Sequence, residues 1–238
     1  MTHRNTIIRG DCLDILPQLP ARSVNFVLTD PPYITRYKSR DGRTIRNDDN
    51  DAWLKPAFAE MFRVLEPNAF AVSFYGWPQT HRFMEAFREA GFRVVGHLVF
   101  PKHYTSGQGR VRYQHECAYL LAKGDPARTN APIGDVIPWG TYTGNKLHPT
   151  QKPLAILKPL IEAFSRPGGL VLDPFAGSGS SLLAAKMLER NYLGIELDEK
   201  YHRTASTRME CRTPKADEST KDRKNVFVIS SATRCPSP

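Results

Sequence analysis

Short apolar runs recur along the chain and alternate with longer stretches in which apolar residues return at helical spacing. We expect strands at Thr6–Arg9, Val24–Thr29, Ala69–Phe74, Arg93–Phe100, Glu116–Ala122, Gly169–Leu172 and Tyr192–Ile195. We expect helices at Cys12–Leu19, Ala52–Leu65, Gln79–Ala90, Pro153–Ser165, Ser180–Glu189 and Glu199–Arg212. This alternation predicts an α/β fold, with a seven-stranded, mostly parallel sheet and helices on both faces.

The composition changes after Arg212. Residues 213–238 are polar and end in Cys-Pro-Ser-Pro, which predicts a flexible tail with at most a short added strand at Val226–Ile229. Residues 124–147 are rich in Gly and Pro and form a long connection of a kind that is often functional. We therefore expect one domain over residues 1–212.

The charge is strongly positive, with 33 Lys and Arg against 24 Asp and Glu and a formal net charge of +9. Solubility alone would explain such an excess, but so would binding to a polyanion such as double-stranded DNA. Ile34–Arg46 and Lys102–His115 combine basic residues with tyrosines and lack periodicity, so we expect both to be loops. This clustering of basic residues favours binding to a polyanion over a role in solubility alone.

Several classes of protein are disfavoured by the sequence. No apolar run approaches the roughly 18 residues of a membrane span, and the first residues lack a signal-peptide pattern, which predicts a cytoplasmic protein. The four cysteines form no CxxC pair and the seven histidines are scattered, so we expect no metal site.

Asp30-Pro31-Pro32-Tyr33 directly follows an apolar strand. A Pro-Pro pair by itself is most often a rigid turn, but ligands bind at the carboxyl ends of strands in open α/β sheets. The Asp30 carboxylate and the Pro31 carbonyl could accept the two N–H bonds of a base amino group, which would make its nitrogen more nucleophilic. Tyr33 could stack on that base, which would have to leave the duplex.

A second motif, Asp173-Pro174-Phe175-Ala176-Gly177-Ser178-Gly179, links a strand to a helix. Its glycines permit close approach of a ligand to the backbone. A dinucleotide fingerprint would place a third glycine where this chain has Leu182. Glu196 ends the next strand, where a carboxylate is placed to accept ribose hydroxyls or is simply exposed to solvent.

Two further segments carry polar groups. In His148-Pro149-Thr150-Gln151-Lys152-Pro153, Lys152 could pair with a ligand carboxylate, or the segment is only a helix-start loop. In Gly10-Asp11-Cys12, Asp11 could accept from an adenine amino group or cap the following helix.

Together these motifs resemble the permuted β group of S-adenosylmethionine-dependent DNA amino-methyltransferases, over roughly Thr6 to Arg212. The resemblance implies a circularly permuted, Rossmann-like methyltransferase fold in which the strands ending in Asp30 and Asp173 are neighbours. It implies that the catalytic residues are Asp30, Pro31, Pro32 and Tyr33. It also implies a site for S-adenosylmethionine built from Asp11, Cys12, Thr150, Lys152, Asp173, Phe175, Gly177, Ser178, Gly179 and Glu196. Gln114-His115-Glu116 resembles the segment that leads into the antiparallel strand of this family.

The resemblance implies methylation of adenine N6 in double-stranded DNA by a cytoplasmic, nucleoid-associated enzyme of restriction–modification. No segment is long enough for a separate recognition domain, so target recognition is expected from residues about 34–51 and 101–147, or from a second subunit of a homodimer. A cognate restriction endonuclease is a further conceivable partner.

Transfer to cytosine N4 or to an RNA base is the alternative within this class. C5-cytosine chemistry is disfavoured because the chain has no Pro-Cys step. From other classes, the intact Asp30–Tyr33 argues against a silent DNA-binding regulator, and Leu182 argues against a dehydrogenase.

Overall fold

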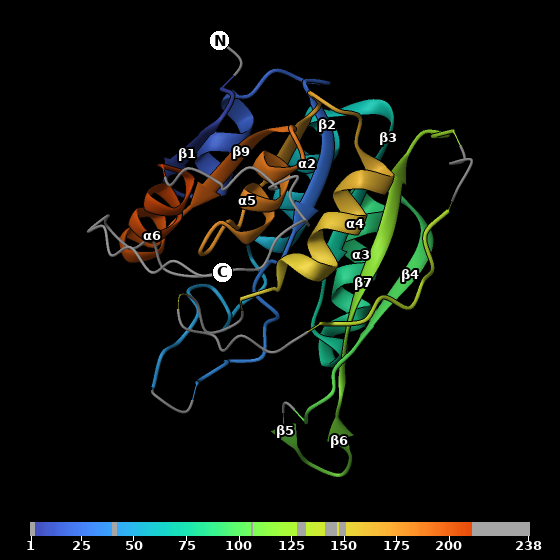
Figure 1. The fold of residues 1–238 in the computed structure, drawn as a ribbon, viewed down its shortest axis with the longest axis vertical. Coiled ribbons are helices and arrows are strands. Elements are labelled where there is room, and N and C mark those ends of the chain that lie inside the picture. The colour runs from blue at the N-terminus through green and yellow to red at the C-terminus, as the bar shows by residue number, and fades with distance from the viewer. Residues whose placement is uncertain are drawn as a thin grey trace, which may run out of the picture.

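A seven-stranded sheet with the order β1-β9-β8-β2-β3-β7-β4 forms the centre of the computed structural model (Figure 1). The structure describes residues 3–39, 42–105, 107–127, 132–140, 147 and 151–210. The strands are β1 (Thr6–Arg9), β2 (Val24–Thr29), β3 (Leu65–Phe74), β4 (Arg93–Pro101), β7 (His115–Lys123), β8 (Leu170–Asp173) and β9 (Asn191–Glu196). Neighbouring strands pair in parallel except at β7, which is antiparallel to both β3 and β4.

Helices cover both faces of this sheet. They are α1 (Cys12–Ile15), α2 (Leu54–Val64), α3 (Thr80–Ala90), α4 (Leu154–Phe164), α5 (Ser180–Met187) and α6 (Glu199–Glu210). One apolar core joins α1, α2 and α3 to one face, and a second core joins α4, α5 and α6 to the other. Because both faces are covered, β2 is buried at nearly every position, which explains its continuous apolar sequence. The predicted fold class is confirmed.

Two local predictions are wrong. The predicted helix Cys12–Leu19 divides into α1 and a 3₁₀ turn at Leu16–Gln18, because Pro17 has no N–H to continue the α-helical hydrogen bonds. The stretch Lys102–His115 is not only a loop, since β5 (Gly107–Gln108) and β6 (Arg112–Tyr113) form an antiparallel hairpin. Each of these strands has two residues, too few to show a period.

Some predictions lie outside the described residues, namely those on Thr150, on part of residues 124–147 and on the tail 213–238. Among the residues that the structure does describe, no helix is both long and apolar enough to cross a membrane.

Candidate functional site

Four acidic residues stand at the carboxyl ends of four adjacent strands. Asp11 follows β1, Glu196 ends β9, Asp173 ends β8 and Asp30 follows β2. Since these strands run in parallel, their carboxyl ends meet at one edge of the sheet. The sequence motifs therefore converge in space although Asp11 and Glu196 stand near opposite ends of the described chain.

Two adjoining cavities open at this edge and share Asp30, Phe175 and Gly177. The first is lined, among others, by Asp11, Cys12, Asp30, Pro31, Pro32, Tyr33, Phe175, Gly177 and Glu196. The second is lined, among others, by Asp30, Lys152, Asp173, Phe175, Gly177 and Ser178. Asp30 thus stands where the two cavities meet, and Pro31, Pro32 and Tyr33 line the first cavity beside it.

Asp30 is held by two donors. The Tyr33 hydroxyl donates to Asp30 Oδ1 at 2.8 Å, and Lys152 Nζ donates to Asp30 Oδ2 at 2.6 Å and to the Tyr33 hydroxyl at 3.1 Å. Lys152 Nζ also lies 3.3 Å from Glu116 Oε2. An ammonium group has three N–H donors, and these three oxygen atoms suffice to occupy them. Lys152, expected at a ligand carboxylate, contacts the Asp30 carboxylate in this structure.

Lys102 and Glu116 complete a charged cluster that sequence reasoning missed. Lys102 Nζ donates to Glu116 Oε1 at 2.6 Å, and the Tyr33 hydroxyl lies within hydrogen-bond distance of Glu116 Oε2 at 3.2 Å. The signal that could have found Glu116 is strand direction. Because β7 is antiparallel to its neighbours, its amino end reaches the edge where the other strands have their carboxyl ends.

The cluster contains two carboxylates and two ammonium groups, so its formal charges cancel. Burial raises the pKa of Asp30, against the opposing effect of the Lys152 charge. Burial also acts to raise the pKa of Glu116, but Lys152 and Lys102 outweigh it and lower that pKa to about 2. Burial, together with Asp30 and Glu116, raises the pKa of Tyr33 well above its usual value, so Tyr33 stays protonated as a donor.

The backbone around Tyr33 is tightly constrained. Ile34, which follows it, has φ of 59°, a conformation that β-branched residues rarely adopt. On the other side, a Cβ added at Gly76 would stand 2.7 Å from Tyr33 Cβ, so only glycine fits there. Strain of this kind is frequent at functional sites, where the surrounding structure maintains it.

The glycine loop is attached to Glu196. The Gly177 N–H donates to Glu196 Oε2 at 2.7 Å, and the Asp198 N–H donates to Glu196 Oε1 at 2.7 Å. Each carboxylate oxygen keeps a second acceptor site. Burial raises the pKa of Glu196 to about 7. On α6, the buried Arg208 donates from Nη1 to the Ser178 carbonyl oxygen at 2.5 Å. This hydrogen bond attaches the glycine loop to α6.

Asp173 and Asp11 both have structural partners. Asp173 Oδ1 accepts from the Thr29 hydroxyl and from the Phe175 N–H, each at 3.1 Å, and its Oδ2 accepts from Ser181. Burial raises the pKa of Asp173 to about 6. Asp11 Oδ1 accepts from the Leu13 N–H at 2.9 Å, so the capping alternative is present in the structure while Asp11 also lines the first cavity.

Gly179 lies at the N-cap of α5. Its φ of 76° favours glycine, and an added Cβ would stand 3.0 Å from Ala205 Cβ. This geometry explains the glycine through the backbone and through packing on α6.

Residues 34–51 fold onto the first cavity. Asp48, which is 2% exposed, accepts at Oδ2 from the Tyr37 N–H at 2.6 Å and from the Thr35 hydroxyl at 3.3 Å. Thr35, Tyr37 and residues 44–48 line that cavity. Part of this segment is therefore a wall of the candidate cofactor site, in addition to any contact it makes with DNA.

Comparison with known proteins places this geometry among DNA methylases. A family model described as DNA methylase matches residues 24–207. YubD of Escherichia coli (strain K12), a methylase by name, is 54% identical over 202 residues, which cover 85% of this chain and 88% of YubD.

Two solved structures share the fold. The crystal structure of the M1.HpyAVI–SAM complex matches with a TM-score of 0.69 at 25% identity, over 87% of this chain and 99% of that chain. The PvuII DNA methyltransferase, which is cytosine-N4-specific, matches with a TM-score of 0.73 over 90% of this chain and 89% of that chain, but its 17% identity supports the fold alone.

Proposed function

Since this chain belongs to the DNA methylase family and is an S-adenosylmethionine-dependent DNA methyltransferase of the N6/N4 group, we propose that its product is N6-methyladenine in double-stranded DNA. The observation that carries the proposal is the position of Asp30, which lines both of two adjoining cavities. The residues proposed for the cofactor line both cavities, and Pro31 and Tyr33, proposed to hold a flipped base, line the first cavity beside Asp30. The choice of adenine rests on the family resemblance, because Asp at the first position of this tetrapeptide is commoner in adenine enzymes.

The cofactor supplies an electrophilic methyl group, and the residues of this chain prepare the acceptor. Asp30 and the Pro31 carbonyl accept the two N–H bonds of the amino group, and this draws its nitrogen towards a tetrahedral, more nucleophilic form. Tyr33 and Lys152 hold the Asp30 carboxylate in place before the base arrives. Because Asp30 already accepts one of these N–H bonds, it is also placed to take the proton that the amino group loses after transfer, and the rise of its pKa on burial favours its protonation.

The donor set at the other strand ends fits an adenosine with a charged amino acid. We infer that Glu196 accepts the ribose hydroxyls at its two remaining acceptor sites, and that Asp173 attracts the positive amine of the methionine end. Asp11, beside Cys12, is proposed to face the adenine ring. Phe175, Gly177 and Ser178 would approach the cofactor through the loop backbone, and Thr150 would assist at the carboxylate.

Lys152 is proposed to serve the catalytic carboxylate first. Its three donors already face Asp30, Tyr33 and Glu116, so contact with a cofactor carboxylate requires it to release one of them. This assignment differs from the role that the family resemblance implies.

The test separates the chemistry from cofactor binding. Asp30→Asn keeps the shape of the side chain but removes its charge, so transfer should fall at least a hundredfold, while calorimetry should give a cofactor affinity within a few-fold of the parent. Glu196→Gln is the matched control, because it should weaken cofactor binding about tenfold through the loss of charge-assisted hydrogen bonds. Loss of cofactor binding in Asp30→Asn would overturn this division of roles.

The product is identified by digesting methylated duplex DNA to nucleosides and analysing them by mass spectrometry. N6-methyladenine is expected. N4-methylcytosine would overturn the adenine assignment and leave the mechanism intact, whereas methylated RNA without methylated DNA would overturn the substrate.

A further inference from the structure

Trp77 is the most exposed large apolar side chain among the described residues, at 64%. The other two tryptophans, Trp53 and Trp139, are 3% and 4% exposed. Trp77 begins the 3₁₀ turn Trp77–Gln79 that follows β3. The preceding residue, Gly76, packs directly against Tyr33. The exposed Trp77 indole therefore belongs to the residue directly after Gly76, which contacts Tyr33 of the catalytic tetrapeptide.

A hydrogen bond to its backbone and an aromatic contact hold Trp77 in position. The turn is closed by the Thr80 hydroxyl, which donates to the Trp77 carbonyl oxygen at 2.7 Å. The indole stacks on the Tyr113 ring, with centroids 6.0 Å apart and an angle of 26° between the ring planes. Tyr113 belongs to β6, so this pair joins the body of the domain to the hairpin.

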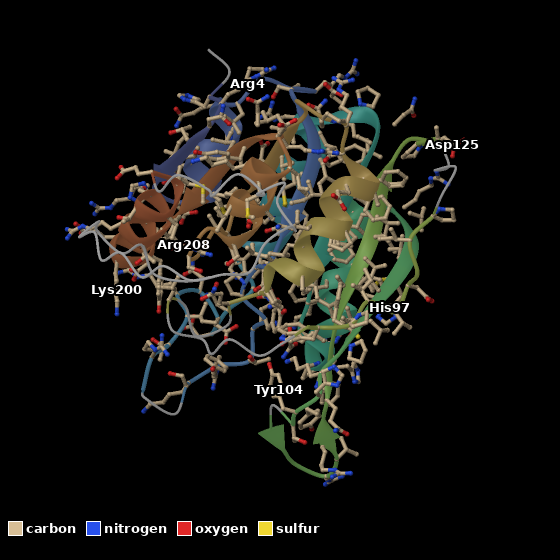
Figure 2. All side chains as sticks on the ribbon, in the orientation of Figure 1. Arg4, His97, Tyr104, Asp125, Lys200 and Arg208 are labelled. Atoms are coloured by element: carbon tan, nitrogen blue, oxygen red, sulfur yellow. The ribbon has the colours of Figure 1, made fainter. Side chains whose placement is uncertain are left out.

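The hairpin extends from the catalytic edge of the sheet. β4 ends and β7 begins at the edge where β2 and β8 have their carboxyl ends, and the β5–β6 hairpin connects them. Figure 1 shows it projecting beyond the sheet, and Figure 2 labels Tyr104 between the sheet and the hairpin. Arg110, Val111 and Arg112 are exposed, Val111 at 62%. The hairpin thus exposes cationic and apolar side chains at the edge of the sheet that contains the candidate active site.

We propose that Trp77, supported by Tyr113, is a stacking surface for a DNA base or base pair next to the flipped target base, while Arg110 and Arg112 contact the adjoining phosphates. Flipping leaves unstacked faces in the duplex, and aromatic or apolar side chains commonly cover such faces. The two arginines favour a polyanionic partner over an apolar protein surface. The inference rests on the DNA methyltransferase activity and is independent of the choice between adenine and cytosine.

The distribution of tryptophans makes a direct test possible. Because two of the three are buried, collisional quenching by acrylamide reports mainly on Trp77. The probe is sheared genomic DNA from a methylation-deficient host, which contains every short sequence, added to the full chain with S-adenosylhomocysteine. Saturating DNA should lower the tryptophan emission and protect it from acrylamide. In Trp77→Phe, both changes should disappear although fluorescence anisotropy of labelled DNA still shows binding.

A second measurement gives the contribution of Trp77 to DNA binding. Because base–aromatic stacking contributes to DNA affinity, Trp77→Ala should raise the KM for DNA about tenfold and leave cofactor affinity unchanged. Trp77→Phe should recover part of this loss. Val95→Ala is the matched control, since Val95 is a 43% exposed apolar residue near the other end of β4, and it should behave as the parent.

The proposal would be overturned if saturating DNA left the quenching of Trp77 by acrylamide unchanged. It would also be overturned by protection of Trp77 that follows protein concentration without DNA, since that would make this surface an interface between copies of the chain. A failure of the adenine assignment would be seen separately, in the product analysis, because Trp77→Ala should yield the same methylated nucleoside as the parent.

Discussion

Replacing Lys102 with Met should reveal how far the buried cluster depends on charge balance. The Lys102 ammonium is 2.6 Å from Glu116 Oε1, and the two side chains are 4% and 22% exposed. Methionine keeps the aliphatic stem that packs near Trp139, whose ring centroid is 4.6 Å from Lys102 Nζ. The substitution therefore removes the charge with little loss of packing, and it leaves the cluster with one excess negative charge.

The magnitude follows from what remains beside Glu116. Removal of one partner from a buried ion pair typically costs about 3–5 kcal/mol. Lys152 still lies 3.3 Å from Glu116, and Glu116 is partly accessible to water, so we expect a loss near the lower limit, about 3 kcal/mol. Glu116→Gln alone leaves an excess positive charge and should cost a similar amount. The double variant restores neutrality, so its cost should be about 2 kcal/mol smaller than the sum of the two single costs.

Urea unfolding of the four proteins at pH 7 measures this coupling. The variants should shift the midpoint with the same m value, because the surface exposed on unfolding is unchanged. If the two single effects add within about 0.5 kcal/mol, the charges do not interact and the account of the cluster is wrong.

Three other properties can be checked. Burial raises the pKa of Glu196 to about 7 from the usual 4.5, so the fold should lose stability as pH rises through this interval. Cofactor affinity measured by calorimetry should increase from about pH 6 to 8, and this increase should be smaller in Glu196→Gln. Gly179→Ala should lower thermal stability by about 1–2 kcal/mol because of its positive φ, and normal stability would refute the conformational reason for this glycine. A chain ending at Arg212 should retain methyl transfer, since α6 ends at Glu210, and loss of activity in a folded truncated chain would assign a role to the tail.

The sheet was predictable because its strands are buried on both faces. A short continuous apolar run such as Val24–Thr29, in a chain that alternates such runs with helical patterns, is typical of a buried parallel strand. The strand β2 has the predicted bounds. The four acids were predictable as a group for a related reason. Each follows a strand, and parallel strands bring their carboxyl ends together, so linear motifs became neighbours once the strand order was known.

The partners of individual polar groups were not predictable. The sequence predicts Lys152 at a ligand carboxylate, but in the structure Lys152 donates to Asp30, which is 122 residues away in the chain. The two residues come together where α4, which follows Lys152, packs against β2 and β3. The sequence places Glu116 at the start of a strand but gives it no partner, because a sequence pattern shows the period of a strand and not its direction in the sheet. The contact between the Trp77 indole and the Tyr113 ring of the hairpin was not predictable either, because the two residues belong to separate segments of the chain.

The pairing of β1 with β9 has a consequence for how the protein folds. Asn5 and Asn191, which join these strands side by side, are 186 residues apart in the chain. In the described sheet β1 pairs with β9, so its backbone groups stay unpaired during synthesis until β9 has been made. The strands β2, β3, β4 and β7 can pair earlier, beside Asp30–Tyr33. Contacts of such long sequence separation are slow to form. The part of the candidate site that contains Asp11 and Glu196 should therefore form last, and a ligand that contacts both residues would stabilise the pairing of β1 with β9 in the newly made chain.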